Sequence, residues 1–503
     1  MRKKIKRAVV LRVLTLTLLL CLLVPMGVAF AETPTQISVV KTSVGTDEAL
    51  GQSFQHHSFY AEGRLWVFYM QDSPSYRIVY TSSEDGITWE TAVAVIEYEC
   101  TYGEGCSKNG SMFDLWYDYT DKTIDFCVVN TSDEEKPIYY RRGVPDSTGT
   151  VTWNGTWQIA VAGEAGNRFW TPVIAVNTSN NPAIAYTVTD GTNFNVNLSV
   201  SSTANGSWTS TTDSPIGNCS NSSYMTAWGS IIPVTNGNFS LTYAYGTNTS
   251  TLWTYAQTYA GLLSGNWTYY DRESFVSIEN TLGFTNALYY DTVNASTATY
   301  DDDVFMVYTD NASNILFNYR NASTGATVWN NEETVAEGSY YPALSLRNSS
   351  NDMVLSALKI PTVLPEALYS ADFDFATLTW GTVTQTYDGD YSTSSDVKIM
   401  ASYRYGSPLS TQWTDYDIAL EASLISGCYG CDATETPAST IPASVTTMAW
   451  VVILVFGALI CILLLGYGAY ETMQGRAKYE LMKIGMVGFI TFVIAAIIVE
   501  NLL

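Results

Sequence analysis

Ser82-Ser83-Glu84-Asp85-Gly86-Ile87-Thr88-Trp89 is the stretch that decides the fold, because it joins a polar turn to a tryptophan and the combination recurs along the chain. The recurring tryptophans that follow turn-like stretches are Trp89, Trp153, Trp208, Trp267, Trp329 and Trp380. Their mean spacing is about 58 residues, which indicates a repeated structural unit.

Each unit has the same predicted layout of two paired strands, a third strand, the turn with its tryptophan and a fourth strand. The strand pairs lie within residues 59–69, 112–129, 170–188, 225–245, 285–308, 341–358 and 397–420, and third strands include residues 78–80, 138–140, 315–317 and 367–369. Four-stranded units repeated around an axis are β-propeller blades. Seven strand pairs predict seven blades, whereas six tryptophans allow six.

Ring closure is expected to come from the beginning of the body. The last unit lacks a tryptophan and a fourth strand, and Gln36-Ile37-Ser38-Val39-Val40 can supply that strand. Closure would remove exposed sheet edges, which invite aggregation. The predicted fold class is therefore all-β, a six- or seven-bladed β-propeller ectodomain followed by two transmembrane α-helices.

The first repeat resembles the Asp-box of sialidase-like β-propellers, Ser-x-Asp-x-Gly-x-Thr-Trp. The aligned residues are Ser82, Glu84, Gly86, Thr88 and Trp89, with Glu84 in place of the Asp. The match is degraded elsewhere, as at residues 201–208 and 323–329. The resemblance implies that the turn joins the third and fourth strands away from any active site and that its tryptophan packs between sheets. It therefore bears on the fold rather than on chemistry.

The sialidase resemblance also implies three arginines that grip a substrate carboxylate, a Tyr–Glu nucleophile and an Asp acid/base. The nine arginines of the body are Arg64, Arg77, Arg141, Arg142, Arg168, Arg272, Arg320, Arg347 and Arg404. Tyr76-Arg77-Ile78-Val79 only partly matches the family's early arginine motif, and Arg77 falls on a third strand. We expect no sialidase site and assign no catalytic residue. A glycoside hydrolase that uses other carboxylates stays open as an alternative.

Other residue types that carry chemistry are few. His56 and His57 are the only histidines, no nucleophile motif accompanies them, and we interpret them as surface or loop residues. Asp301-Asp302-Asp303 and Asp388-Gly389-Asp390 lack a calcium-loop pattern and are interpreted as solvated turns. No metal site and no cofactor is predicted.

The ends of the chain predict export and anchoring. A basic start, an apolar run and Ala29-Phe30-Ala31 indicate a signal peptide, and the uncharged run 448–470 is long enough to cross the roughly 30 Å hydrocarbon layer. The basic loop should stay cytoplasmic. The expected domains are signal peptide 1–31, propeller 32–431, Thr/Pro/Ser-rich stalk 432–447, transmembrane helix 448–470, cytoplasmic loop 471–483, transmembrane helix 484–499 and extracellular tail 500–503.

Charge and cysteines limit the class of partner. Residues 32–446 contain 15 Lys plus Arg and 45 Asp plus Glu, a net charge of −30, so nucleic acid is excluded as a partner. An even cysteine count in an exported body predicts disulfides. Cys100 with Cys106 and Cys428 with Cys431 are the expected short loops, and Cys127 with Cys219 is the remaining pair. We interpret the CxxC as a structural clip rather than a redox or zinc site.

Fifteen Asn-x-Ser/Thr sequons predict an N-glycosylated surface. The acceptor candidates are Asn109, Asn130, Asn154, Asn177, Asn197, Asn205, Asn218, Asn221, Asn238, Asn248, Asn266, Asn294, Asn311, Asn321 and Asn348. Aromatic clusters offer a ligand-binding face, although sheet packing accounts for most of them. These clusters include Tyr139-Tyr140, Tyr289-Tyr290 and Tyr403-Arg404-Tyr405.

The leading hypothesis is a membrane-anchored propeller, at a cell surface or in a viral envelope, that binds glycans or protein partners. The alternatives are an exported sialidase-like glycoside hydrolase and a structural component of a surface coat. Glycines in the two apolar runs permit close helix contacts, through which several copies could associate. Inward-facing arginines and carboxylates together would favour the enzyme.

Overall fold

The computed structural model describes residues 36–41, 49–51, 55–71, 76–97, 110–129, 137–190, 192–204, 208–210, 216–220, 228–234, 237–246, 252–263, 266–279, 290–294, 304–309, 314–320, 333–337, 339–347, 352–359, 367–374, 379–388, 399–401, 409–416 and 422–429. The chain divides into two compact units, Met1–Thr434 and Glu435–Leu503, and all described residues belong to the first. They contain no helix long and apolar enough to cross a membrane. The predicted signal peptide and both predicted spans lie outside them.

Seven antiparallel sheets make up the described part of the chain. The first three contain β2 (Ser58–Ala61), β3 (Arg64–Gln71), β4 (Arg77–Ser83) and β5 (Val93–Glu97); then β6 (Phe113–Asp118), preceded by the short η1 (Gly110–Met112), β7 (Thr123–Val129), β8 (Ile138–Pro145), β9 (Val151–Trp153) and β10 (Gln158–Val161); and β11 (Arg168–Val176), β12 (Pro182–Thr189), β13 (Asn193–Ser201), β14 (Trp208–Ser210) and β15 (Gly217–Ser220).

The other four contain β16 (Trp228–Pro233), β17 (Phe239–Gly246), β18 (Leu252–Leu263) and β19 (Asn266–Glu279); β20 (Tyr290–Asn294), β21 (Val304–Thr309), β22 (Ile315–Arg320) and β23 (Glu333–Ala336); β24 (Ser339–Arg347), β25 (Asp352–Lys359), β26 (Ala367–Asp374), β27 (Thr379–Trp380) and β28 (Thr384–Asp388); and β29 (Ile399–Ala401), β30 (Leu409–Tyr416), β31 (Ala422–Tyr429) and β1 (Gln36–Lys41).

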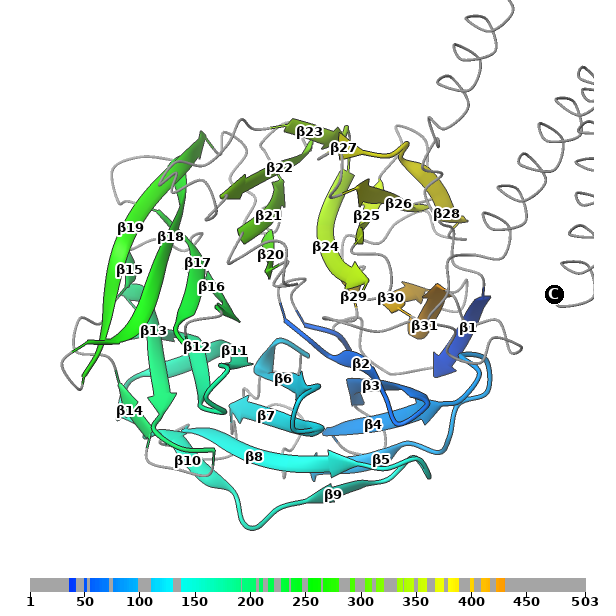
Figure 1. Ribbon diagram of the computed structural model, residues 1–503, viewed down its shortest axis with the longest axis horizontal. Coiled ribbons are helices and arrows are strands. Elements are labelled where there is room, and N and C mark those ends of the chain that lie inside the picture. The colour runs from blue at the N-terminus through cyan, green and yellow to red at the C-terminus, as the bar shows by residue number, and fades with distance from the viewer. Residues whose placement is uncertain are drawn as a thin grey trace, which may run out of the picture. The chain divides into compact units, whose positions relative to one another are not determined.

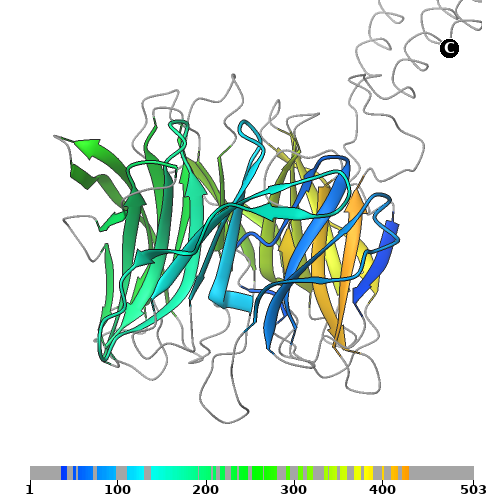
Figure 2. The ribbon, with the colours of Figure 1, turned by 90° about the horizontal axis from the view of Figure 1, so that it is seen from below.

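The sheets stand around a ring. The innermost strands are β2, β6, β11, β16, β20, β24 and β29 (Figure 1), and the strands run roughly along the ring axis (Figure 2). Innermost strands of successive sheets contact each other, as β11 does with β16 and β20 with β24. This is the arrangement of a seven-bladed β-propeller. All seven predicted strand pairs and the four predicted third strands are confirmed, and the count of seven blades is settled by the sheets rather than by the tryptophans.

The first strand of the chain closes the ring, as predicted. β1 pairs antiparallel with β31, with Gln36 opposite Cys428 and Val39 opposite Ile425. The strand thereby becomes the outermost strand of the seventh blade. The two ends of the ring are thus joined by main-chain hydrogen bonds.

The turn at 82–89 joins β4 to β5, the third and fourth strands of the first blade. The structure differs from the alignment in the residue that holds the turn. Asp85 Oδ1, rather than Glu84, accepts hydrogen bonds from the N–H groups of Ile87 (2.8 Å) and Thr88 (2.7 Å). These bonds to its charged form lower the pKa of Asp85 to about 2. Gly86 supplies the positive φ of 71° that the turn requires.

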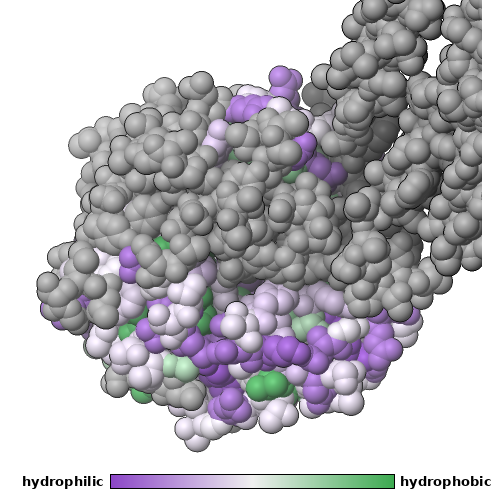
Figure 3. Space-filling view, in the orientation of Figure 1, coloured by the Kyte–Doolittle hydropathy of each residue, from purple (hydrophilic) through white to green (hydrophobic). Residues whose placement is uncertain are grey.

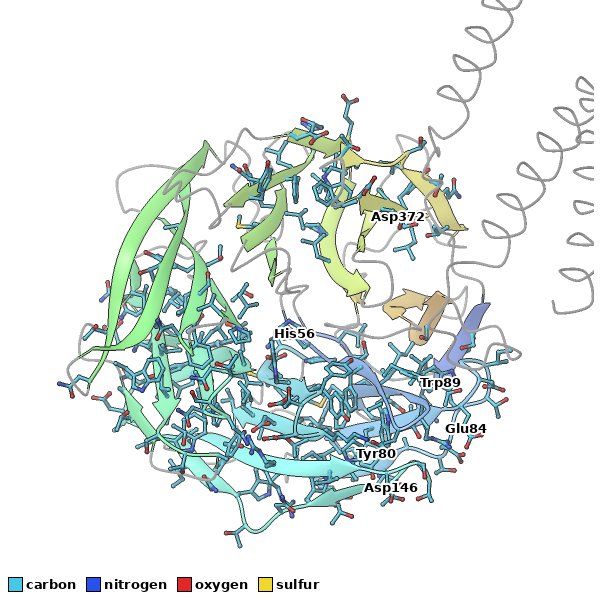
Figure 4. The ribbon with its side chains drawn as sticks, viewed as in Figure 1. His56, Tyr80, Glu84, Trp89, Asp146 and Asp372 are labelled. Atoms are coloured by element: carbon cyan, nitrogen blue, oxygen red, sulfur yellow. The ribbon has the colours of Figure 1, made fainter. Side chains whose placement is uncertain are left out.

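Glu84 has a different role from the one that the alignment gave it. It forms an ion pair with the buried Arg64, which also pairs with Glu90 at 3.0 Å. Arg64 Nε donates to Ser82 Oγ at 3.0 Å. Glu84 and Trp89 lie at the outer side of the first blade (Figure 4). The arginine therefore fastens both sides of the turn to the start of β3.

Tryptophans at the start of the fourth strands pack against the preceding blade. Trp89 Nε1 donates to Ser38 Oγ of β1 at 2.9 Å. The ring of Trp208 lies edge-on to Tyr140 of the second blade, with centroids 5.0 Å apart. Trp380 contacts Phe317 of the fifth blade in the same way, at 5.1 Å. These three tryptophans therefore seal contacts between blades. Trp153 and Trp267 instead have ring contacts with Phe126 and Phe239 of their own blades, and Trp329 lies outside the described residues.

The fourth strand is divided in three blades. In the second blade β9 and β10 both pair with β8, and the third and sixth blades repeat this with β14 and β15 and with β27 and β28. The β8–β9 hairpin extends across the outside of the first blade (Figures 1 and 2), where Val151 N–H donates to Tyr80 Oη at 3.1 Å. Division of the strand leaves a short loop, residues 154–157, at the outer edge of the second blade.

Ser38→Ala should weaken ring closure. Ser38 is 8% exposed, accepts the Trp89 Nε1–H bond and donates to Gly86 O at 2.6 Å, so the substitution removes the partner of the partly buried Trp89 N–H and of the buried Gly86 carbonyl. We expect a loss of about 2 kcal/mol in the free energy of unfolding, measured with urea. Val39→Ala on the same strand is the control, because Val39 is 51% exposed and should change stability little. Equal effects of the two substitutions would contradict this role.

Candidate functional site

The outer edge of the second blade brings together the most ligand-like group of side chains that the structure describes. Successive residues of β8 point to opposite faces of the sheet. Tyr139 and Arg141 therefore share one face, while Tyr140 and Arg142 share the other. Trp153 at the end of β9 and Trp157 before β10 join the first pair. We call Tyr139, Arg141, Trp153 and Trp157 the outer-edge site.

Arg141 lies between the two indoles of the outer-edge site. Its guanidinium carbon is 5.6 Å from the ring centroid of Trp153 and 5.4 Å from that of Trp157. Both distances are within the range of cation–π attraction. Tyr139 meets Trp157 edge-on at 6.5 Å, and Phe126 supports both indoles from below at 5.8 and 6.0 Å. The four side chains are thus held in place before any ligand arrives.

The backbone around the site is shaped by glycines. Gly143 faces Trp153 across the β8–β9 ladder, and a Cβ there would lie 2.7 Å from the Trp153 ring. Gly155 has a φ of 58°, which turns the chain between the two tryptophans. Its carbonyl accepts a hydrogen bond from Arg141 Nη2 at 3.2 Å, and Asn154 N–H donates to Arg142 O at 2.8 Å. The loop and the arginine therefore fix each other.

The outer-edge site is accessible. All four of its side chains are partly exposed, residues 154–156 are exposed, and the neighbouring Ile159 is 56% exposed. Partial burial lowers the pKa of Arg141 from its ordinary value, although the guanidinium remains charged. The surrounding surface of the described blades is mostly hydrophilic with small separate hydrophobic areas (Figure 3). Among the described residues no group of His, Cys, Asp and Glu could hold a metal ion.

The opposite face of β8 contains a buried polar cluster between the second and third blades. Asp125 Oδ1 accepts hydrogen bonds from Tyr140 Oη and from Arg142 Nε and Nη2, the last two at 3.0 and 2.8 Å. Arg142 also donates to Asn180 Oδ1 of the third blade at 2.7 Å. Burial raises the pKa of Asp125 to about 6 despite the arginine. These groups join blades and are closed to a ligand, since Asp125 is fully buried.

The two histidines are buried, which corrects the expectation of surface residues. His56 and His57 are 2% and 1% exposed, and they lie in the segment that leads into β2, with His56 on the inner side of the second blade (Figure 4). The His56 N–H donates to Asp114, whose other oxygen accepts from Ile174 N–H at 2.7 Å. His57 stacks on Phe113 with centroids 3.8 Å apart. The histidines thus fasten the first blade to the second, and Asp114 continues the link to the third.

The described arginines do not form a carboxylate grip. Arg64 and Arg142 are buried in internal ion pairs, and Arg77 donates to Gln71 Oε1 at 3.2 Å from the third strand β4. Arg141 belongs to the outer-edge site, and Arg168 is exposed at the start of β11. The side chains of Arg272, Arg320 and Arg347 are not described, and Arg404 lies outside the described residues, as do residues 301–303 and 389–390.

Two sequence predictions, the Cys127–Cys219 disulfide and glycosylation of Asn177, are wrong because Cys127 and Asn177 are buried. Cys127 is a free, fully buried thiol on β7, so it does not pair with Cys219, which lies on the outer strand β15 of the next blade. Burial raises the pKa of the Cys127 thiol well above its usual value. Asn177 is 4% exposed, and its amide nitrogen donates to Gly237 O at 2.5 Å, so it is closed to glycosylation in the folded protein. Cys100, Cys106 and Cys431 lie outside the described residues, and Cys428 lies on β31.

The remaining acceptor candidates fall into three groups. Asn154 and Asn266 are exposed, Asn197 and Asn238 are half-buried, and Asn218 and Asn294 lie on strands whose side chains are not described there. Outside the described residues are Asn109, Asn130, Asn205, Asn221, Asn248, Asn311, Asn321 and Asn348. Of the predicted aromatic clusters, Tyr139 joins the outer-edge site and Tyr140 turns inward; Tyr289 and residues 403–405 are outside the described part.

Trp157 and Asp125 were not singled out from the sequence. The signal for Trp157 was its spacing, four residues after Trp153 and on the far side of the sequon Asn154-Gly155-Thr156. Asp125 had no signal, because nothing in the sequence shows that it faces Arg142 across β7 and β8. Alternation along β8 alone would have separated Arg141 from Arg142.

Comparisons with known proteins give only distant structural similarity. No family model matches the sequence, and no curated protein matches it. Among solved structures, the BP39L lectin from Burkholderia pseudomallei matches with 13% identity, 78% of this chain, 96% of the lectin and a TM-score of 0.46. The polysaccharide lyase Uly1 matches with 9% identity over 80% of this chain and 100% of the lyase, at a TM-score of 0.43. The Hadza microbial sialidase Hz136 matches with 12% identity over 63% of this chain and 65% of the sialidase, at a TM-score of 0.40. Matches at these TM-scores carry no argument about binding or activity.

His57 should make the protein less stable in acid. Burial lowers the pKa of His57 to about 3, so between pH 6.5 and 3 the unfolded chain binds a proton that the folded protein does not. Stability should therefore fall as the pH decreases, by roughly 2 kcal/mol from this group between pH 7 and 5. In urea unfolding at both pH values, His57→Gln should remove that part of the difference. An unchanged pH dependence in the variant would refute the assignment.

Gly143→Ala should displace Trp153. The added methyl group meets the indole and Val151, so we expect a loss of about 1–3 kcal/mol and a shifted tryptophan emission spectrum. Val144→Ala is the control, since Val144 is the next residue and is 40% exposed. Native stability and emission in Gly143→Ala would show that the indole does not lie against β8.

Proposed function

We propose that this chain is a surface-displayed β-propeller that binds glycans at the outer edge of its second blade. The observation that carries the proposal is the position of Arg141 between the partly exposed indoles of Trp153 and Trp157. Rigid aromatic side chains beside an arginine are the residues from which binding hot spots are built.

The chemistry of the outer-edge site suits a sugar ring. Sugar rings present apolar C–H faces, which pack on indole, and hydroxyl oxygens, which accept hydrogen bonds. Arg141 has only donors, and one of its N–H groups is used by Gly155 O, so others can serve a ligand. Because Phe126 and Tyr139 fix the indoles, little side-chain entropy is lost on binding.

The charge of the body favours neutral glycans. Residues 32–446 have a net charge of −30, which repels acidic sugars at long range. Within the outer-edge site, Arg141 is the one positive charge that opposes this repulsion. We therefore propose uncharged hexose or N-acetylhexosamine chains rather than sialosides or uronates.

Display outside the cell is the second part of the proposal. It rests on the sequence of the two ends, which favours a cleaved signal peptide before residue 32 and a membrane hairpin at 448–499. The stalk 432–447 would hold the propeller away from the membrane. The surface is that of a cell or of a viral envelope, and several copies can associate through the helices.

The positions of the described arginines and carboxylates favour a binding role over hydrolysis, because the residues that a glycosidase site would need are buried. Arg64 and Arg142 are buried, and each is used in an internal ion pair, Arg64 with Glu84 and Arg142 with Asp125. The carboxylates Asp114 and Asp125 are equally enclosed. These buried residues stabilise the propeller itself. Among the described residues, the outer-edge site remains as the group of accessible side chains that neighbouring contacts hold in place.

Arg141→Ala and Trp157→Ala should each weaken glycan binding by about tenfold or more, which corresponds to about 1.4 kcal/mol. The measurement is a glycan array, followed by titration calorimetry with the best neutral glycan, on the detergent-solubilised full chain produced in a host that does not N-glycosylate proteins. Arg168→Ala is the matched control, because this arginine is exposed on the neighbouring blade and outside the site.

Binding that survives both site substitutions would place the ligand elsewhere. A fluorogenic glycosidase panel, run with the same protein, tests the alternative. Release of a fluorophore from any glycoside would replace the binding proposal by a hydrolase, and silence in both assays would favour a protein partner or a coat component.

A further inference from the structure

The loop inside the outer-edge site contains a glycosylation sequon. Asn154, Gly155 and Thr156 stand between Trp153 and Trp157, and all three are exposed. Gly155 turns the chain with a φ of 58°, and Asn154 uses its N–H but not its side chain to hold the loop on Arg142 O. An acceptor amide at an exposed turn is the arrangement that glycosylation needs.

The other acceptors with described side chains are less suitable. Asn177 is closed by its own hydrogen bonds, and Asn197 and Asn238 are half-buried. Asn266 is exposed and also stands beside a tryptophan, but Trp267 is 8% exposed and packs on Phe239. Asn154 is therefore the exposed acceptor whose neighbouring indoles are accessible too.

We propose that Asn154 carries an N-glycan whose first sugars lie on Arg141 and Trp157, so that modification closes the outer-edge site to ligands from outside. This inference rests on the proposed glycan-binding function and adds its regulation. In the modification, Asn154 Nδ2 forms a bond to the anomeric carbon of an oligosaccharide on a lipid diphosphate, the donor class that transferases of this kind use. The anomeric C–O bond breaks, the lipid diphosphate leaves, and the amide loses one proton to a base.

Tethering makes even weak docking effective. Asn154 is adjacent to Trp153 and three residues from Trp157, and consecutive Cα atoms are about 3.8 Å apart. A group held by so short a tether has an effective concentration in the mM range or above. A site with mM affinity for the sugar is then at least about half occupied, and the attached glycan outcompetes a free glycan at μM concentration.

The test is made with the full chain from an N-glycosylating host, compared with Asn154→Gln and with Asn266→Gln as the matched control. Mass spectrometry of the peptide that contains residue 154 establishes the modification. Hydrogen exchange of residues 151–161 should be about tenfold slower in the glycosylated chain than in Asn154→Gln, and unchanged by Asn266→Gln. Trp157→Ala should keep the glycan but lose the protection.

Binding in trans gives the second measurement. The probe is the chain's own N-glycan, released and fluorescently labelled. Asn154→Gln should bind it about tenfold more strongly than the glycosylated chain does, and Asn154→Gln/Arg141→Ala should lose that binding. An unmodified Asn154, or a modified one without protection of residues 151–161, overturns the inference.

Failure of the proposed function gives a different result. In that case no glycan on the array binds Asn154→Gln in a manner sensitive to Arg141, whatever the exchange data show. Protection that depends on Trp157 would then still support docking of the attached glycan, because that measurement uses no external ligand.

Discussion

Pairing of β1 with β31 is the interaction on which the ring depends. Without it the seventh blade would have three strands and no main-chain hydrogen bonds would join the two ends of the ring. The pairing is reinforced from the first blade, because Trp89 donates to Ser38 and Ser38 donates to Gly86 O. The closing strand is therefore held on one side by main-chain hydrogen bonds and on the other by the turn that recurs in the sequence.

Blade-to-blade contacts use both apolar and polar groups, which explains how so acidic a chain packs. The largest fully buried side chains include Trp66, Trp116 and Tyr140. Beside them the ionisable residues Asp114, Asp125 and Arg142 are buried with partners from a neighbouring blade or strand. A buried charge is tolerated only with such partners. The polar groups thus set which blade faces which, while the aromatic groups supply the buried area.

Much of the fold could be predicted because it is local. Period-two strands and turns located all seven blades, the regular tryptophan marked six of the units, and the unfilled fourth strand located the closure. The predictions that were wrong or missing concern features that depend on contacts between residues far apart in the sequence. A one-residue shift separates Glu84 from Asp85 in the turn, and only the fold shows which carboxylate closes it. The burial of His57, the free thiol of Cys127 and the pairing of Asp125 with Arg142 are likewise tertiary. The sequence patterns pointed to two of the four residues of the outer-edge site, Tyr139 in an aromatic pair and Trp153 in the tryptophan repeat. They did not point to Trp157.

The closing strand also governs the order of events in folding. Six blades consist of strands close together in sequence, so each can form soon after its residues are available. The seventh joins residues near 36 to residues near 428, the most distant strand pairing in the ring. β1 must therefore wait, unpaired, until β31 has been made. During that interval a strand with the exposed Val39 is open to other chains. Because pairing between distant residues is slow, we expect the closure of the ring, rather than packing of its core, to be the slow and concentration-sensitive step of folding.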